Sequence, residues 1–337
     1  MISFLIPLLF SIPHHQQYHM ICYYKWNEPP LKDVDISLCS HIILIGQLYL
    51  DNLGHLQLPP DHISQDFSGL KKQRQDLKLL ICLTGPNHGF SEVVSLYQNP
   101  IYRQIVSSTA TMSTLADASY AFLKKFSFDG LDIDWEFPSW SSDSQKTDRQ
   151  RFPLLLKTLR DKFGSTLLLT VAVSGPPTIT KVAYETESFN RYVDLVNVMN
   201  YDFHIFSYFH PFVGFNAPLR KLCLEVEVAS LMNSVTEASM LTWKKLGLWS
   251  NKTVHFFLIK FLLTIQPFVL KVFGIPTYGR GYRLINWRVN KPYSLASGTV
   301  DGLSKYSKDR TMFTVSVVTV PIHFFALSKK NFYEGDV

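Results

Sequence analysis

Short apolar runs of strand length alternate along this chain with longer stretches in which apolar residues recur at helical spacing. Stretches 102–126 and 148–163 place Leu, Ile, Phe and Tyr at helix-like intervals, and Gly164 lies where the second helix should end. The runs of strand length are 21–24, 41–45, 77–82, 130–135, 166–173, 195–200 and 272–275. Strands that alternate with helices join into a parallel sheet, so the pattern predicts an α/β fold, either doubly wound or barrel-shaped.

The positions of the polar residues distinguish these two architectures. No Gly-x-Gly-x-x-Gly follows the first run, so the main signal of a dinucleotide-binding fold is missing. Acidic and aromatic residues instead finish several runs: Asp134 and Glu136, Tyr201 and Asp202, and Tyr278. In a TIM (β/α)8 barrel the carboxyl ends of all strands meet at one face, where catalytic residues gather. The sequence therefore predicts a TIM barrel.

Composition narrows the class of protein further. With 337 residues, 46% of them hydrophobic and 18% charged, the chain is long and apolar enough to fold around a large core. A net charge of +6 without a long basic run gives no indication of nucleic-acid binding. The four cysteines lie far apart with no CxxC pair, which indicates neither a zinc site nor a disulfide-dense scaffold.

The most informative segment is 128–138, which reads FDGLDIDWEFP. Side chains on a strand alternate between its two faces, so Asp132, Asp134 and Glu136 share one face, opposite two aliphatic residues and a tryptophan. Carboxylates forced together inside a barrel cannot all ionise cheaply, so at least one pKa must rise. A carboxyl group that stays protonated at neutral pH can protonate a leaving group.

The three acids allow two other interpretations. A solvated acidic strand edge does not require Trp135 and aliphatic residues on the opposite face, and is therefore disfavoured. Three carboxylates also suit Mg²⁺ or Ca²⁺, and their spacing alone leaves a metal site open.

Asp129-Gly-Leu-Asp132-Ile-Asp134-Trp-Glu136 resembles, at every signature position, the DxxDxDxE motif of the family 18 glycoside hydrolases, the chitinases and chitinase-like proteins. Segments similar to other barrel strands of that family are 22–24, 38–43, 199–202 and 274–280. The resemblance covers roughly residues 20–283. It implies a TIM barrel that binds chitin or chito-oligosaccharides and hydrolyses β-1,4-N-acetylglucosamine linkages without a cofactor or metal. We also expect a secreted, extracellular monomer.

The resemblance also implies a role for each motif residue. Glu136 would be the general acid, and Asp134 would hold the substrate's N-acetyl group, whose oxygen attacks the anomeric carbon in a substrate-assisted, retaining route. Asp132 would share a proton with Asp134, Asp129 would support the base of the strand, and Tyr201 would donate a hydrogen bond to the acetamido oxygen.

The other positions that the resemblance assigns to substrate binding are Tyr23, Gly85, Asn87, Phe137, Met199, Asp202 and Tyr278. Tyr23, Tyr201 and Tyr278 could each instead be packing aromatics. Cys22 and Cys39 correspond to a disulfide-linked pair in the family, and such a bond agrees with secretion.

The chain departs from the family pattern where substrate would bind. The family's third strand ends in SxGGW, whereas this chain reads CLTGP, with Thr84 in place of a glycine and Pro86 in place of the tryptophan. The eighth strand and its tryptophan have no counterpart after residue 282. A chitin-binding, chitinase-like lectin or signalling protein with little turnover is therefore the alternative function. A non-functional fragment is a third interpretation, because an open barrel exposes two strand edges.

The expected organisation is a secretory leader over 1–19 followed by the catalytic domain over 20–337. The leader lacks a preceding positive charge and a clean cleavage site, so an apolar first segment packed on the protein is the alternative. Residues 282–337 resemble the start of the family's α+β insertion region, truncated. The apolar stretch 254–270 is short for a membrane span and contains Lys260 and Pro267, so no span is expected.

Stretch 254–270 has no family counterpart between a helix-like segment, 238–253, and the seventh strand. We interpret it as translated non-coding sequence or a misjoined gene model, with the same origin for the missing eighth strand. Sequencing cDNA across residues 253–271 should yield transcripts without the insert; an insert in abundant mature transcript would contradict this interpretation.

Overall fold

The computed structural model describes residues 19–84, 98–220, 236–248, 272–274, 280–300 and 311–314, except 52, 54, 142, 287 and 290. The strands are β1 (Ile21–Lys25), β2 (His41–Leu50), β3 (Leu56–Gln57), β4 (Lys78–Thr84), β5 (Gly130–Asp134), β6 (Leu168–Ser174), β7 (Leu195–Met199), β8 (Val272–Phe273), β9 (Arg280–Leu284), β10 (Ala296–Val300) and β11 (Thr311–Thr314). The α-helices are α1 (Asp61–Ser68), α2 (Gln98–Ile105), α3 (Thr109–Lys125), α4 (Asp148–Phe163), α5 (Pro177–Ala183), α6 (Thr186–Tyr192) and α7 (Thr236–Lys245). Short 3-10 helices are η1 (Leu31–Asp33), η2 (Ile36–Leu38) and η3 (Gly69–Lys72).

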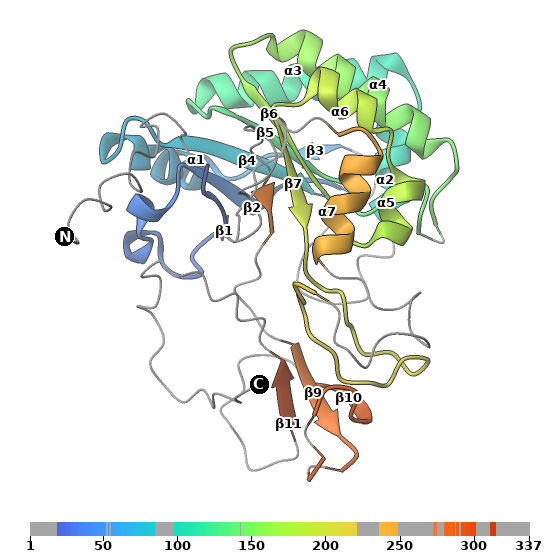
Figure 1. Ribbon diagram of the computed structural model, residues 1–337. Helices are drawn as coiled ribbons and strands as arrows, with labels where there is room; N and C mark the ends of the chain where they lie inside the picture. Colours follow the sequence, from blue (N-terminus) through green and yellow to red (C-terminus); the bar gives the residue numbers. More distant parts are fainter. Residues whose placement is uncertain are drawn as a thin grey trace, which may run out of the picture.

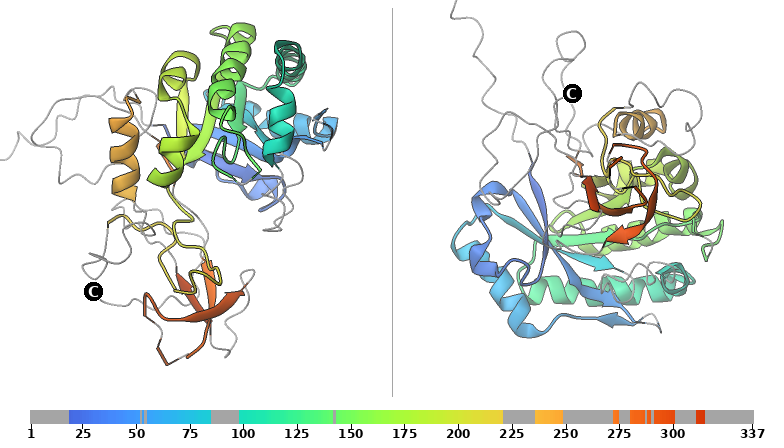
Figure 2. Two further views of the ribbon diagram at one scale, coloured as in Figure 1. Left: turned by 90° about the vertical axis from the view of Figure 1, so that its right-hand side faces the viewer. Right: turned by 90° about the horizontal axis from the view of Figure 1, so that it is seen from below.

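The main sheet has the order β1-β2-β4-β5-β6-β7-β8, with parallel pairing throughout, and β3 adds an antiparallel edge to β2. The sheet curls, and the helices lie on its outer side (Figures 1 and 2). All seven predicted strands are confirmed, and the architecture is that of a TIM barrel. Within the described residues no strand joins β8 to β1, so the barrel remains open at this point.

Two apolar layers follow from the alternation of side chains along the strands. The outward-facing residues of β5, Leu131 and Ile133, belong to the large core between sheet and helices. A smaller cluster of Ile43, Leu80 and Cys82 is separate from that core. Because successive residues of a strand point to opposite faces, this second cluster fills the concave inside of the sheet. The barrel interior therefore supplies the low-dielectric surroundings of any acid on that face.

The close pairing of β5 with β6 depends on Gly130. A Cβ atom built on this residue would lie 2.2 Å from the carbonyl oxygen of Leu168. Any larger side chain would push β6 away, so the glycine of the acidic motif has a structural role.

Local capping residues explain where the helices begin and end. The predicted helix over 102–126 is divided into α2 and α3, because the Ser108 side chain accepts a hydrogen bond from the Thr111 amide (3.1 Å) and starts a new helix. The predicted end of α4 is confirmed: Gly164 follows it with φ of 58°. Helix α7 ends at Lys245, earlier than the segment 238–253 indicated, and Gly247 follows with φ of 82°.

A second, antiparallel sheet with the order β10-β9-β11 follows the last barrel strand. It lies apart from the barrel, below it in the view of Figure 1. Tyr282, Leu284 and Ala296 pack with Val213, from the segment after β7, into a small core. The predicted extra region after residue 282 therefore contains ordered strands, while its proposed truncation lies outside the described residues.

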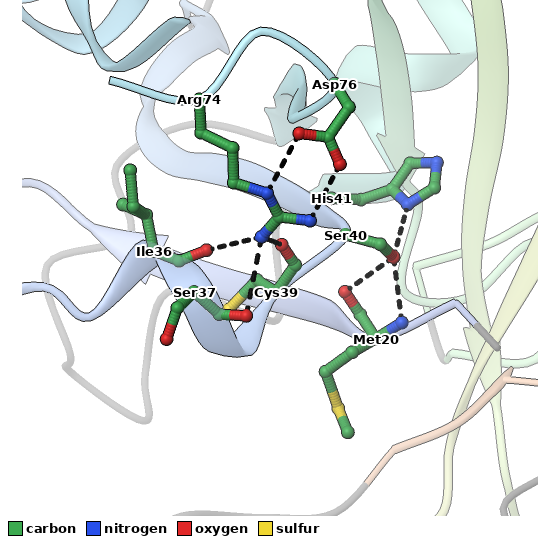
Figure 3. Close-up of polar contacts among 8 residues, drawn as sticks. All are labelled: Met20, Ile36, Ser37, Cys39, Ser40, His41, Arg74 and Asp76. Atoms are coloured by element: carbon green, nitrogen blue, oxygen red, sulfur yellow. Dashed lines mark hydrogen bonds and ion pairs between the residues drawn. The ribbon is translucent and has the colours of Figure 1, made fainter. Parts of the chain in front are cut away.

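The amino ends of β1 and β2 are joined by several contacts at the base of the sheet (Figure 3). Cys22 and Cys39 form the expected disulfide. The Arg74 guanidinium donates to the carbonyl oxygens of Ile36 and Cys39, both at 2.7 Å, and forms an ion pair with Asp76. These contacts fix the loop that carries η2.

Replacing both cysteines of this bond (Cys22→Ser with Cys39→Ser) is expected to lower the free energy of unfolding by about 2–4 kcal/mol. The disulfide joins residues that are 17 positions apart, and its loss frees that loop in the unfolded chain. Urea denaturation measures the difference. A reducing agent should destabilise the parent protein equally and leave the double variant unchanged; equal midpoints for parent and variant would contradict the expectation.

Within the described residues, every helix is too short or too polar to cross a bilayer. Most of the proposed leader, residues 1–18, and the whole stretch 254–270 lie outside the described residues.

Candidate active site

Strand β5 delivers the three acids to the carboxyl end of the sheet. Asp132 lies within the strand and is fully buried, Asp134 is its last residue, and Glu136 follows two positions later, half-buried. On the opposite face Trp135 is 1% exposed and stacks on Tyr102, with ring centroids 4.8 Å apart. The predicted division of this segment into an acidic and an apolar face is therefore confirmed.

Asp132 accepts hydrogen bonds from four different strands. Its Oδ2 accepts from the hydroxyl of Tyr23 at 3.0 Å, and its Oδ1 accepts from Asn197 Nδ2 at 3.2 Å and from the Thr170 hydroxyl. The Cys82 thiol is a fourth donor. Burial raises the pKa of Asp132, and these four donors oppose the rise because they stabilise the carboxylate.

Asp134 has a very different environment. Its Oδ1 is buried and has no hydrogen-bond partner in the part of the chain that the structure describes. Burial raises the pKa of Asp134 well above its usual value, and the neighbouring charges of Glu136 and Asp132 raise it further. The pKa of Asp134 is therefore raised further than that of Asp132, whose carboxylate is stabilised by its four donors.

Glu136 titrates near neutrality. Burial is the main cause that raises its pKa to about 7, and the negative charge of Asp202 adds to the rise. A carboxyl group with this pKa is substantially protonated at neutral pH and can donate its proton to a leaving oxygen.

Asp202 is held at the edge of this group by contacts from a distant part of the chain. Both of its carboxylate oxygens bind Arg280 of β9, at 3.0 Å from Nε and 2.7 Å from Nη2. Its amide donates to Asn216 Oδ1 at 3.0 Å, in a backbone conformation with φ of 57°. The Arg280 pair thereby ties the second sheet to the carboxyl end of β7.

Tyr201 and Met199 lie at the same end of β7. Met199 is the last residue of the strand and is half-buried. The Tyr201 ring lies so close to Gly274 that a Cβ there would be 2.6 Å from its Cε1 atom. Gly274, in the family-like segment 274–280, therefore leaves the space that this ring occupies.

The remaining predicted site residues lie in different parts of the structure. Tyr23 is 40% exposed, yet its hydroxyl is held by Asp132 and Asn197. Phe137 is half-buried against the main core. Asp129 lies just before β5, at the end opposite the other acids, where its Oδ2 accepts a hydrogen bond from the Leu79 amide at 2.7 Å. Gly85, Asn87 and Tyr278 lie outside the described residues.

Sequence reasoning missed four residues that contact these acids: Cys82, Thr170, Asn197 and Arg280. Thr170 and Asn197 each interrupt an otherwise apolar strand, and that local signal marks polar side chains inside a barrel. No polar interruption of an apolar strand identifies Arg280, because it contacts Asp202 only when the chain is folded.

Thr84, at the end of β4, is buried, and its hydroxyl has no partner within the described residues. A methyl and a hydroxyl group therefore occupy space beside the acidic strand, where the family has glycine. Among the described residues, no group of three or more His, Cys, Asp or Glu side chains is arranged to hold a metal ion.

Solved structures with this fold include the Group IV chitinase of Ostrinia furnacalis, which has 26% sequence identity and a TM-score of 0.70 over 88% of this chain and 76% of that chain. The same enzyme has been solved in complex with allosamidin, with a TM-score of 0.69.

Curated relatives include chitotriosidase-1 of Mus musculus, 28% identical over 289 residues, which are 83% of this chain and 55% of the relative. The oviduct-specific glycoprotein of Papio anubis is 27% identical over 90% of this chain and 46% of the relative. The chain thus spans about half the length of these relatives. The family model for glycosyl hydrolases family 18 matches residues 19–330. This match covers most of the chain, and the acidic strand lies buried in a barrel similar to that of a chitinase. The chain therefore belongs to glycosyl hydrolases family 18.

Proposed function

We propose that this protein hydrolyses β-1,4-N-acetylglucosamine linkages in chitin or chito-oligosaccharides, with Glu136 as the general acid. The observation that carries the proposal is the pair of raised pKa values: about 7 for Glu136, and well above the usual range for its neighbour Asp134. Two carboxyl groups with raised pKa values at the end of one barrel strand can provide a proton donor and a group that binds an amide. The chitinases of Ostrinia furnacalis and Mus musculus support the choice of substrate.

In the proposed reaction the substrate supplies its own nucleophile. The acetamido oxygen attacks the anomeric carbon, the glycosidic C–O bond breaks, and Glu136 transfers its proton to the departing oxygen. Asp134 binds the acetamido N–H and stabilises the positive charge of the oxazolinium ion, and Tyr201 donates a hydrogen bond to the acetamido oxygen. Glu136 then takes a proton from a water molecule, whose oxygen attacks the anomeric carbon and opens the oxazolinium ring. This step returns Glu136 to its acid form.

Asp132 has a positioning role in this scheme. Its pKa is raised by burial despite the four donors, so it can take a share of the Asp134 proton as positive charge develops on the substrate. Asp129 would fix the base of β5 through the Leu79 amide. Met199, Asp202, Tyr23 and Phe137, with Gly85, Asn87 and Tyr278 beyond the described residues, are the proposed substrate contacts.

The stereochemistry of the first product tests this mechanism. Incubating the purified protein with chitotetraose should release a β-anomer, which then equilibrates with the α-anomer, because the oxazolinium route retains configuration. Proton NMR in the first minutes distinguishes the two. Release of the α-anomer first would contradict the substrate-assisted route, and absence of any product would contradict hydrolysis.

The charge of Asp202 should be visible in the pH profile. Asp202→Asn is expected to lower the pKa of Glu136, because it removes a negative charge that raises it. A lower pKa means that the acid loses its proton at lower pH, so the alkaline limb of kcat should move below pH 7. The matched control is Asp161→Asn, an exposed residue paired with Lys157 on α4, which should leave the limb unchanged. An unshifted limb in Asp202→Asn would show that this charge does not act on Glu136.

One observation favours the alternative of a chitin-binding lectin or signalling protein with little turnover. Thr84 occupies buried space beside the acids, and the family tryptophan after it is replaced by proline. We propose secretion, an extracellular location and a monomeric state for either function, with residues 20–337 as the carbohydrate-binding unit. Retained binding to chitin without any product from chitotetraose would identify the lectin.

A further inference from the structure

A buried tyrosine joins the carboxyl ends of β4 and β5 from the outer side of the sheet. Tyr102 of α2 is fully buried, and its hydroxyl donates to the carbonyl oxygens of Leu83 at 2.9 Å and of Asp134 at 3.1 Å. We propose that Tyr102 is a positioning residue that fixes the distance between the carboxyl groups of Asp134 and Glu136. This role depends on the proposed function, since it concerns the same two acids, and it belongs to a side chain that is shielded from the substrate.

The hydroxyl contact lies where the pairing of β4 with β5 ends. The last paired residues of the two strands are Leu83 and Ile133, and each strand continues by a single residue, Thr84 or Asp134. Backbone hydrogen bonds hold neighbouring strands together only as far as the ladder extends. Because Tyr102 donates to one carbonyl oxygen on each strand, in a shared hydrogen bond, it connects the two strands at this end.

The Tyr102 ring holds the next residue of the acidic segment. It stacks on the Trp135 indole, with 4.8 Å between ring centroids and 7° between the ring planes. Trp135 stands between Asp134 and Glu136 in the sequence and packs in the core on the opposite face from the acids. Hydroxyl and ring therefore hold two successive residues, so the backbone that separates the two acids cannot shift without loss of one of these contacts.

Arg103, the next residue of α2, ties the same helix to the chain that follows the acids. Its guanidinium donates to the carbonyl oxygen of Asp143, and its Nε lies 3.9 Å from Oδ1 of Asp148, the first residue of α4. Asp148 is fully buried, so salt screens this ion pair little. Helix α2 thus contacts both ends of the segment 134–148 and gives Tyr102 a fixed position from which to hold the acids.

The distance between the two acids matters because their charges interact. Burial, and then the negative charge of Glu136, raises the pKa of Asp134; the other charged groups that act on the pair are Asp132 and Asp202. Tyr102 itself stays neutral and keeps its proton for donation, because burial, and then the charge of Asp134, raises the pKa of its hydroxyl well above the usual value. When the hydroxyl is lost, we expect the acids to separate and water to enter. Both changes lower the pKa of a carboxyl group that burial and like charge had raised.

Tyr102→Phe tests the proposal, because it removes the hydroxyl and keeps the stacked ring. On a fluorogenic chitotrioside kcat should fall about ten- to a hundredfold, the scale of loss when a catalytic group is misplaced. KM should stay at the parent value, since Tyr102 is buried away from the substrate, and the alkaline limb of kcat should move to lower pH.

Tyr24→Phe is the matched control. Tyr24 is 5% exposed, stacks on Phe67 and donates its hydroxyl to the Pro29 carbonyl oxygen at 2.9 Å, but its ring and hydroxyl contact no acid. Both variants lose a largely buried hydroxyl group, so both should unfold at a lower urea concentration than the parent. Only Tyr102→Phe should lose kcat. An equal loss of kcat in the two variants, or a parent kcat in Tyr102→Phe, overturns the proposal.

A second measurement separates the role of Tyr102 from hydrolysis. Carbon-13 NMR of labelled carboxyl groups follows the titration of Glu136, whose signal is identified by its absence in Glu136→Gln. The titration should centre at pH about 7 in the parent and in Tyr24→Phe, and at lower pH in Tyr102→Phe. A parent-like titration in Tyr102→Phe also overturns the proposal. A parent without turnover contradicts the proposed hydrolysis alone, because the titration still decides whether Tyr102 positions the acids.

Discussion

Glu136→Gln is expected to lower kcat on a fluorogenic chitotrioside by about 10²- to 10⁴-fold, the usual contribution of a general acid. Glutamine keeps the shape of the side chain but carries no acidic proton, so the leaving oxygen must depart unprotonated. KM should change little, because in the proposed mechanism the acetamido group and the sugar rings still meet Asp134 and Tyr201. The matched control is Glu187→Gln, an exposed residue of α6 paired with Arg191, which should retain the parent rate.

The pH profile of the parent adds a second test of the same residue. The acid must be protonated before the bond breaks, and the pKa of Glu136 is about 7. The parent rate should therefore fall about tenfold for each pH unit well above 7, whereas any residual rate of Glu136→Gln should lack this limb. Equal rates and equal profiles for parent and variant would contradict the assignment of Glu136 as the acid.

Trp135→Ala should have the largest effect on stability, a loss of about 3–5 kcal/mol in the free energy of unfolding. The indole is 1% exposed, stacks on Tyr102 and meets the Phe152 ring edge to face at 5.4 Å. Its removal leaves a cavity between β5 and the helices that its neighbours cannot fill. A domain of this kind is stable by about 5–15 kcal/mol, so the variant would lose a large share of the total.

Urea denaturation followed by circular dichroism measures this loss. Trp140→Ala is the matched control, because the same side chain is 44% exposed there and its removal creates no internal cavity. The control should lie within about 0.5 kcal/mol of the parent, as is usual for surface substitutions. Equal midpoints for the two variants would contradict the role of Trp135 in the core.

The strands and the acidic face were predictable because both depend on local periodicity. All seven parallel strands fall where the apolar runs placed them, since a buried strand requires such a run whatever its neighbours are. Asp132 and Asp134 likewise share a face because they are two residues apart on one strand. The family motif added a role for each acid, which neither the periodicity nor the structure assigns.

The difference between these two acids was not predictable. Asp132 is stabilised by Thr170 and Asn197, which are 38 and 65 residues away along the chain. Arg280 reaches Asp202 across 78 residues. Local patterns do not encode which distant side chains will meet, because contacts of this kind are fixed by the order of the strands in the sheet and by the curl of the sheet.

The sequence by itself determined the positions of the parallel strands along the chain, the acidic face of β5 and the family to which the chain belongs. The tertiary structure decided how the acids differ in proton affinity, because donors gathered from four strands stabilise the Asp132 carboxylate, whereas the buried Oδ1 of Asp134 has no hydrogen-bond partner within the described residues. It also decided that Tyr208 and Phe209 face solvent, because nothing in the local sequence distinguishes an exposed aromatic residue from a buried one. Burial and distance create these differences, and both arise only when the chain is folded.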